Sequence, residues 1–274
     1  LHLGVMLSQN NLEGLPKLTL FVLWGLVLGG MAYKVTSAPF HFWAPDVYQT
    51  LSPALAGLFS TLPKIAAFGL LLRLTLQLAD TSSLPVVFAL LALLATASMV
   101  VGNLAALNQL SVRRLMAYSG IAHTGYLLMA LAAAPVYPIG PLVVFYLFIY
   151  ALMNLLAFGV TAVLHQRWGT DDLRLWQHRA TETPRETVLL GIALLSLTGL
   201  PPTAGFIAKL YLFIPVFQAW QDSSQGVYLF LLILALISTV LSLYYYLRVI
   251  IALIQGLPFH KGDEADIPVV EQPP

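Results

Sequence analysis

The stretch LSLTGLPPTAGFIAKLYLF, residues 195–213, combines the two features that decide the fold. It belongs to an apolar run over residues 187–218, which is longer than the roughly 20 residues a helix needs to cross a bilayer. Pro201 and Pro202 stand in its middle between two glycines, and proline removes a helical hydrogen bond and clashes with the preceding turn. We therefore expect two half-helices around a break, with a simple proline kink as the alternative.

A second long run, residues 18–48, is interrupted in the same way. It contains SAPFHFWAPD (37–46), in which Pro39 is the first of two prolines. We expect a second break at this point. Interrupted helices in corresponding positions of a chain are typical of the transport site of inverted-repeat transporters.

The remaining apolar runs each have the length of one membrane span. They do not alternate as barrel strands do, and backbone groups in lipid must be satisfied within the segment, so we expect helices. The chain is 59% hydrophobic and 9% charged, against about 25% charged residues in soluble domains. The sequence thus predicts an all-α polytopic membrane protein of about seven transmembrane helices, two of them broken. The five unbroken runs are 53–79, 84–107, 115–134, 140–164 and 227–254.

Composition also excludes several function classes. The chain has no cysteine, so it has no disulfides, thiolate metal sites or cysteine nucleophile, and its net charge of +1 gives no reason to expect nucleic acid. It begins at Leu1 without a signal peptide, as the middle of a longer chain would. We expect a polar loop at 1–17 after a missing upstream helix, a transmembrane domain at 18–256, and a polar tail at 257–274.

The loops differ strongly in charge between the two sides of the predicted bundle. On one side the loops near 80, 136 and 222 contain only Asp80 and Asp222 as charged residues, and Lys17 is the one cation at the entrance of the first run. The positive-inside rule makes the other side, with loops 108–114 and 165–186, cytoplasmic. Within it, 165–187 is either a short amphipathic helix at the interface or a plain solvated loop. The cations of that side are Arg113, Arg114, Arg167, Arg174, Arg179, Arg185 and Lys261.

Three lysines lie inside the predicted spans: Lys34, Lys64 and Lys209. A rise of about 1.5 Å per residue puts each about 15–18 Å from a helix end, near the middle of the membrane. A lysine there costs about 2.5–3.5 kcal/mol on insertion scales. Inert salt bridges would explain them only if carboxylates lay at the same depth, and the chain has none there. We therefore expect the lysines to transfer protons or cations.

Two histidines are further candidates for the relay. His123 falls at a similar depth, and the ordinary pKa of histidine, about 6.5, suits proton transfer; the alternative is a plain hydrogen bond to a neighbour such as Ser119 or Tyr126. His41 lies at the first break, where it is either a relay member or a cap on freed backbone groups. Other polar residues of the spans could hold water but more often join helices: Tyr126, Tyr146, Tyr150, Asn103 and Asn154.

At these residues the chain resembles the antiporter-like membrane subunits of respiratory complex I. The form PFHFWAPDVYQ is closest to subunit N, the type to which mitochondrial NADH dehydrogenase subunit 2 corresponds. The resemblance covers nearly the whole chain in order, through KVTSAPFHFWAPDVYQ (34–49), SPALAGLFSTLPKIAAFGLLLR (52–73), RRLMAYSGIAHTGYLLMAL (113–131) and LSLTGLPPTAGFIAKLYLF (195–213).

The resemblance implies a fold of fourteen core helices in two inverted repeats, of which this chain spans about helices 7 to 13. By motif, Lys34 matches the lysine before the break of the family's helix 7, Lys64 the bridging lysine of helix 8, and His123 the histidine of helix 10. Lys209 matches the lysine after the break of helix 12. The family's glutamate partner of Lys34 would lie before residue 1, and the last helix is missing.

The resemblance also implies a function: a non-redox, proton-translocating subunit of NADH:quinone oxidoreductase in a bacterial inner membrane. No cofactor is expected in this chain, and flavin, iron–sulfur clusters and quinone would belong to partner subunits. The expected partners are a second antiporter-like subunit, the small-helix subunits and the lipid bilayer. The alternatives are a subunit of a multisubunit sodium/proton antiporter or ion-pumping membrane hydrogenase, and a structural membrane scaffold.

Overall fold

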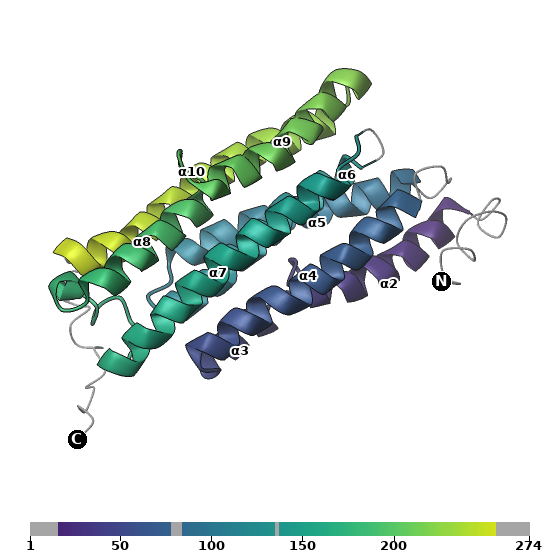
Figure 1. The fold of residues 1–274 in the computed structure, drawn as a ribbon. Coiled ribbons are helices and arrows are strands. Elements are labelled where there is room, and N and C mark those ends of the chain that lie inside the picture. The colour runs from purple at the N-terminus through teal and green to yellow at the C-terminus, as the bar shows by residue number, and fades with distance from the viewer. Residues whose placement is uncertain (1–15, 78–83, 135–136, 256–274) are drawn as a thin grey trace.

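The computed structural model describes residues 16–77, 84–134 and 137–255, so the predicted tail at 257–274 and nearly all of the loop at 1–17 lie outside it. Nine α-helices in these ranges form an elongated bundle (Figure 1). Six of them are long and apolar enough to cross a membrane: α2 (Lys17–Val35), α4 (Pro53–Gln77), α5 (Leu84–Leu107), α6 (Val112–Ala132), α7 (Gly140–Trp168) and α10 (Gly226–Gln255).

Both long runs are interrupted, as predicted. The first is divided into α2 and α3 (Trp43–Thr50), with Pro39 in the irregular segment between them. The second is divided into α8 (Pro184–Thr198) and α9 (Ala204–Ser223), with Pro201 and Pro202 in the turn. These are separate half-helices rather than kinked single helices.

The backbone at the first break is satisfied by the last turn of α2 and by a side chain of α5. Thr36 ends α2 in the left-handed region, and its N–H donates back to the last turn of the helix. Ser98 of α5 accepts a hydrogen bond from the Ala38 N–H at 3.0 Å and lies 2.8 Å from the Ser37 hydroxyl. Freed backbone groups cost several kcal/mol each in a membrane. Ser98 therefore helps make this break tolerable.

The second break has caps on both sides. Gly199 ends α8 with φ 82°, a left-handed conformation that glycine adopts without steric cost. Thr203 begins α9, and its hydroxyl accepts a hydrogen bond from the Phe206 N–H. Gly205 lies so close to α8 that an added Cβ would sit 1.7 Å from the Ser196 carbonyl oxygen. The two half-helices are therefore packed tightly against each other.

Helix α6 forms the centre of the bundle, since all of its residues except Arg114 and Tyr118 are buried. Its closest neighbour is α5. Small residues allow this approach: a Cβ at Gly102 would lie 2.6 Å from the Ala122 nitrogen, and one at Gly125 would lie 2.9 Å from the Ala95 carbonyl. Close packing at small residues is a main source of helix association in membranes.

The outside of the bundle is apolar. Helix α10 shows this clearly, because Leu231, Ala235 and Ser238 are buried on one side while Phe230, Ile233, Leu236, Ile237 and Val240 are exposed on the other. Large exposed apolar faces of this kind suit lipid rather than water.

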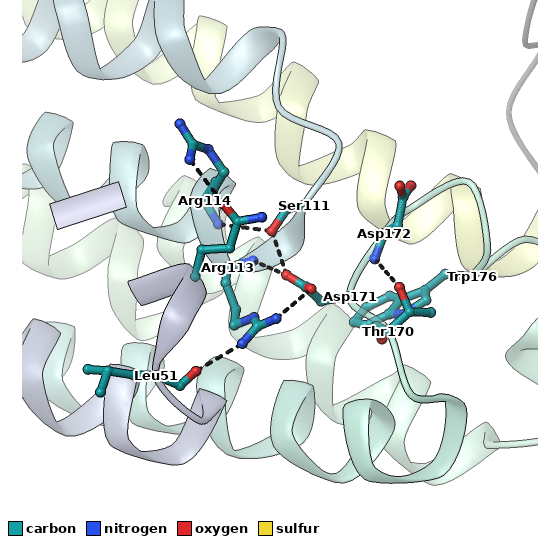
Figure 2. Close-up of polar contacts among 9 residues, drawn as sticks. Leu51, Ser111, Arg113, Arg114, Thr170, Asp171, Asp172 and Trp176 are labelled. Carbon is teal, nitrogen blue, oxygen red and sulfur yellow. Dashed lines mark hydrogen bonds and ion pairs between the residues drawn. The ribbon is translucent and has the colours of Figure 1, made fainter. Parts of the chain in front are cut away.

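The basic connections that the sequence assigned to one side of the bundle lie together at one of its ends. The end of α3, the start of α6 and the segment after α7 meet there (Figures 1 and 2). The amphipathic helix considered for 165–187 is wrong. Helix α7 continues to Trp168 and ends at Gly169, and the following segment contains only the three-residue 3-10 helix η1 (Arg179–Thr181). It is also not simply solvated, since Leu173 and Trp176 are fully buried.

Candidate functional site

Lys64 points into the bundle from α4. Its side chain is buried, and its Nζ donates a hydrogen bond of 2.7 Å to the Gly120 carbonyl of α6. The same amine lies 5.8 Å from the centroid of the Tyr150 ring on α7. A Cβ at position 120 would lie 2.9 Å from this Nζ and 3.2 Å from the Tyr150 hydroxyl, so the glycine makes room for both groups.

His123 lies one helical turn further along α6 and is also buried. Its Nδ1 is hydrogen-bonded to the Tyr146 hydroxyl at 2.6 Å. Three tyrosine rings surround the imidazole, with centroid distances of 5.2 Å for Tyr150, 5.7 Å for Tyr126 and 6.1 Å for Tyr146. The neighbour that is hydrogen-bonded to His123 is thus Tyr146, not the Ser119 or Tyr126 suggested by the sequence, and Ser119 bonds to Tyr246.

Lys209 reaches the same cluster from the other side. It lies in the second turn of α9, is buried, and donates a hydrogen bond of 2.7 Å to the carbonyl of Thr198, the last residue of α8. Its Nζ is 4.9 Å from the Tyr126 ring centroid. A Cβ at Gly199 would lie 2.8 Å from its Cδ, so the glycine that ends α8 also leaves space for the lysine.

These contacts make one continuous buried row: Lys64, Tyr150, His123, Tyr126 and Lys209. The Tyr150 hydroxyl has no hydrogen-bond partner within the described ranges. Among the described residues neither lysine pairs with a carboxylate, since the three ion pairs there all use arginine. Amines, an imidazole and phenols can pass a proton through water or direct hydrogen bonds. We call this row the central cluster.

Lys34 does not join the central cluster. It lies in the last turn of α2 and is exposed on the outside of the described bundle. The adjacent Val35 carbonyl does approach the cluster, because the Thr124 hydroxyl lies within hydrogen-bond distance of both this carbonyl (2.9 Å) and that of Gly120 (3.0 Å). Thr124 thus connects the first break to the Gly120 carbonyl, which accepts the hydrogen bond from Lys64.

His41 is buried in the first break, and its ring lies 6.4 Å from that of Tyr118. Its Nδ1 has no partner in the part of the chain that the structure describes. Its backbone carbonyl accepts from the Ala44 N–H, while Ser98 satisfies the Ala38 N–H. Ser98 thus caps the Ala38 N–H, while the His41 side chain interacts with the Pro39 backbone in the same break.

The two predicted asparagines join helices. Asn154 of α7 donates to Ser60 and Thr61 of α4, and Asn103 of α5 accepts from Tyr245 of α10. Sequence reasoning missed Tyr245 and Tyr246, which are buried beside the cluster, where Tyr246 bonds to Ser119. The signal was present in the triple tyrosine at 244–246 within an otherwise apolar span.

No group of three or more metal-ligating residues occurs within the described ranges. The central cluster places two amines, an imidazole and two phenols, all groups that can bind or release a proton, next to one another.

Comparison with known proteins places this arrangement in a family. A family model described as "NADH:quinone oxidoreductase/Mrp antiporter, TM" matches residues 3–242. The chain is 41% identical over 255 residues to NADH-quinone oxidoreductase subunit N 1 of Roseiflexus castenholzii, and 41% identical over 226 residues to NAD(P)H-quinone oxidoreductase subunit 2 of Synechococcus elongatus. These matches cover 88% and 82% of this chain but only 45% and 41% of the relatives. The chain therefore spans less than half of their length.

Solved structures agree. A chain of respiratory complex I from Thermus thermophilus with bound aureothin superposes with a TM-score of 0.71 at 36% identity, over 89% of this chain and 52% of the other. A chain of the Mrp complex from Dietzia sp. gives a TM-score of 0.75 at 26% identity, over 87% and 43%. The antiporter-like fold expected from the sequence is thus confirmed for this fragment.

Proposed function

The chain belongs to the NADH:quinone oxidoreductase/Mrp antiporter transmembrane family, and from this premise we propose that it is part of a subunit N-type membrane subunit that carries protons for an NADH:quinone oxidoreductase. The oxidoreductase subunits and the complex I chain named above support this assignment, because their identity to this chain, 36–41%, is higher than the 26% of the Mrp chain. Because the chain spans less than half of those relatives, the activity is that of a larger assembly to which it contributes.

The observation that carries the proposal is that two lysines are buried and neither has a carboxylate partner in the described part of the chain. Each amine holds a backbone carbonyl instead, Gly120 for Lys64 and Thr198 for Lys209. Keeping two lysines in the membrane costs about 2.5–3.5 kcal/mol each on insertion scales. A salt-bridged scaffold does not account for that cost, whereas proton exchange does.

In this function the protein moves protons and does no redox chemistry. Lys64 and Lys209 bind and release protons at their Nζ atoms, and His123 and the tyrosines connect them. Lys34 and His41 serve the first break, outside the central cluster, and Thr124 connects that break to Lys64 through the Val35 and Gly120 carbonyls. Flavin, iron–sulfur clusters and quinone belong to partner subunits, which include a second antiporter-like subunit and the small-helix subunits. The location is the bacterial inner membrane, with loops 108–114 and 165–186 in the cytoplasm.

Replacing each lysine by methionine in the assembled complex tests this function. Methionine keeps much of the side chain's volume but binds no proton. We expect Lys64→Met and Lys209→Met to assemble normally and to lose most of the proton pumping that accompanies electron transfer. Proton uptake by inverted membrane vesicles, measured together with NADH oxidation, reports the loss.

Arg73→Gln is the matched control, because Arg73 is an exposed cation on the same helix as Lys64. It should pump as the parent does. Full pumping by both methionine variants would overturn the proposal. Loss of assembly in both, with Arg73→Gln intact, would favour a structural scaffold.

A sodium/proton antiporter subunit is the second candidate, favoured by the superposition on the Mrp complex. The two functions differ in the partners and in the ion. Pumping by the assembled complex that depends on NADH and is unaffected by sodium supports the oxidoreductase. Sodium-dependent exchange without NADH supports the antiporter.

A further inference from the structure

A buried arginine joins three separate parts of the chain at one end of the bundle (Figure 2). Arg113, in the first turn of α6, donates from Nη1 to the Leu51 carbonyl at 2.9 Å and from Nη2 to Asp171 Oδ1 at 2.8 Å. Leu51 is the residue that ends α3, and Asp171 lies in the segment after α7. The side chains of Arg113 and Asp171 are only 11% and 10% exposed.

Each contact of Arg113 has an electrostatic reason. The carboxyl end of a helix carries a partial negative charge, so a cation at the end of α3 is favourable. The same cation in the first turn of α6 faces the partial positive charge of that helix, which is unfavourable. An anion is needed there, and Asp171 supplies it.

Asp171 binds the start of α6 with both carboxylate oxygens. Oδ1 accepts from the Arg113 guanidinium, while Oδ2 accepts from the Arg113 backbone N–H at 3.2 Å and from the Ser111 hydroxyl at 2.5 Å. Burial alone would raise the pKa of Asp171, but these hydrogen bonds and the Arg113 charge lower it below its usual value. The carboxylate therefore stays ionised at neutral pH, and it orients the guanidinium.

The segment that carries Asp171 is itself fixed. Its backbone forms an antiparallel bridge to the α5–α6 connection, with Val112 N–H donating to the Asp171 carbonyl and Leu173 N–H to the Leu110 carbonyl. The Trp176 ring is fully buried and donates to the Thr170 carbonyl at 3.0 Å (Figure 2). Asp171 is thus held in place independently of α3.

Arg114 makes a second, weaker contact to the same half-helix. It donates to Asp46 at 2.7 Å and to Gln49 at 3.0 Å, both in α3. Asp46 is 73% exposed in its side chain, and exposed ion pairs contribute little, about 0–1 kcal/mol. Of the two polar contacts to α3, the buried one through Arg113 is therefore the stronger.

We propose that Arg113, oriented by Asp171, is a positioning residue that fixes α3, the second half of the first broken helix, to the helix that carries His123. Helix α3 places Tyr48 inside the bundle, with its ring 6.2 Å from that of Phe158 on α7. Any part of Arg113 in proton transfer rests on the proposed function. Leaving one partner of a buried ion pair alone is strongly unfavourable, so removing Asp171 should release α3.

A cysteine reporter tests this positioning in the assembled complex. Residues 1–274 contain no cysteine, and Ala44 is a small, buried residue of α3. We expect maleimide to label this subunit at Ala44→Cys about tenfold faster when Asp171→Asn or Arg113→Gln is added, since losing a buried charge partner weakens the attachment by at least that factor. Arg113→Lys is a milder variant that keeps the charge but cannot hold both partners in the same fork.

Two matched controls separate release of α3 from general loosening. Ala106→Cys reports on a buried alanine of α5, and its labelling should not change. Asp172→Asn removes the neighbouring carboxylate, whose ion pair is with Arg174, and should leave Ala44→Cys protected. Equal acceleration at both reporters, or at neither, would overturn the proposal.

Proton pumping is measured on the same vesicles to separate this proposal from the proposed function. We expect Asp171→Asn to lower the protons moved per electron, and the double variant with Arg113→Gln to lose no more than either single one, since the two residues act as one unit. Faster labelling with unchanged pumping would mean that α3 is held as described but does not serve proton transfer. If the lysine variants lose pumping but Asp171→Asn leaves the labelling of Ala44→Cys unchanged, the positioning role alone is refuted.

Discussion

His123 owes its position in the central cluster to three tyrosines rather than to a charged partner. The imidazole lies between the tyrosines that contact the two amines, Tyr150 next to Lys64 and Tyr126 next to Lys209. Tyr146 holds its Nδ1. Since that bond fixes the ring, the hydroxyl of Tyr146 decides how His123 faces the two neighbouring phenols.

Tyr146→Phe tests this arrangement with the smallest possible change. The ring remains, while the hydrogen bond to His123 is lost, which is worth about 0.5–1.5 kcal/mol in stability. We expect normal assembly and pumping slowed by about tenfold, corresponding to a barrier higher by about 1.4 kcal/mol. Tyr244→Phe, on the exposed face of α10, is the control and should pump normally. Unchanged pumping in Tyr146→Phe would show that orientation of the imidazole does not matter.

The sequence predicted how deep these residues lie in the membrane, but not which side chains they contact. Lys64, Lys209 and His123 could be placed near mid-membrane because helical rise converts sequence distance into depth. The rotation of each helix depends on its neighbours, so the exposed position of Lys34 and the contacts of Tyr126 and Tyr150 were not predictable. The cap that Ser98 provides for the Ala38 N–H was hidden for the same reason, because Ser98 comes from another helix.

At the scale of elements, the two breaks were the most predictable feature, because proline acts on its own helix. The segment after α7 was less so. Its mixed charges and two tryptophans suggested either an amphipathic helix or a solvated loop. In the structure Gly169 ends α7 in the left-handed region, and the Asp172 carboxylate accepts from the Arg174 backbone N–H. Trp176 is then buried against the bundle. Local turn geometry and tertiary packing, rather than amphipathic periodicity, determine this segment.

Gly205→Ala tests the tight pairing of α8 and α9. An added Cβ would lie 1.7 Å from the Ser196 carbonyl oxygen, so the half-helices must separate. Overpacking of this kind costs about 1–3 kcal/mol. We expect a lower thermal unfolding temperature of the purified complex and weaker pumping, since Lys209 lies on α9.

Gly191→Ala is the matched control for this variant. It lies in α8, and an added Cβ there meets nothing within 4 Å. It should be neutral or slightly stabilising, because alanine favours helix over glycine by about 0.8–1.0 kcal/mol. Equal unfolding temperatures for both variants would contradict the packing described for the second break.

For the whole molecule, sidedness follows from the loops. The basic connections predicted to share one side do meet in the structure, where Arg113 binds the end of α3 and the segment after α7. Their position in the cytoplasm remains a prediction from the positive-inside rule.

Thr181→Cys and Ser224→Cys measure this orientation. Both residues are exposed, the first in η1 and the second at the end of α9. A membrane-impermeant maleimide should label Thr181→Cys only in inverted vesicles and Ser224→Cys only in right-side-out ones. The reverse pattern would invert the topology and reassign which face each break serves.

The central claim is that Lys64 and Lys209 act by gaining and losing protons, not merely by carrying charge. Arginine separates these roles, because its guanidinium keeps a positive charge but cannot be deprotonated in proteins. The most direct measurement is therefore the number of protons pumped per electron by assembled complexes that carry Lys64→Arg or Lys209→Arg. The proposed relay predicts that both assemble and that this ratio falls sharply; a parental ratio in both would show that a fixed charge suffices and would contradict the account.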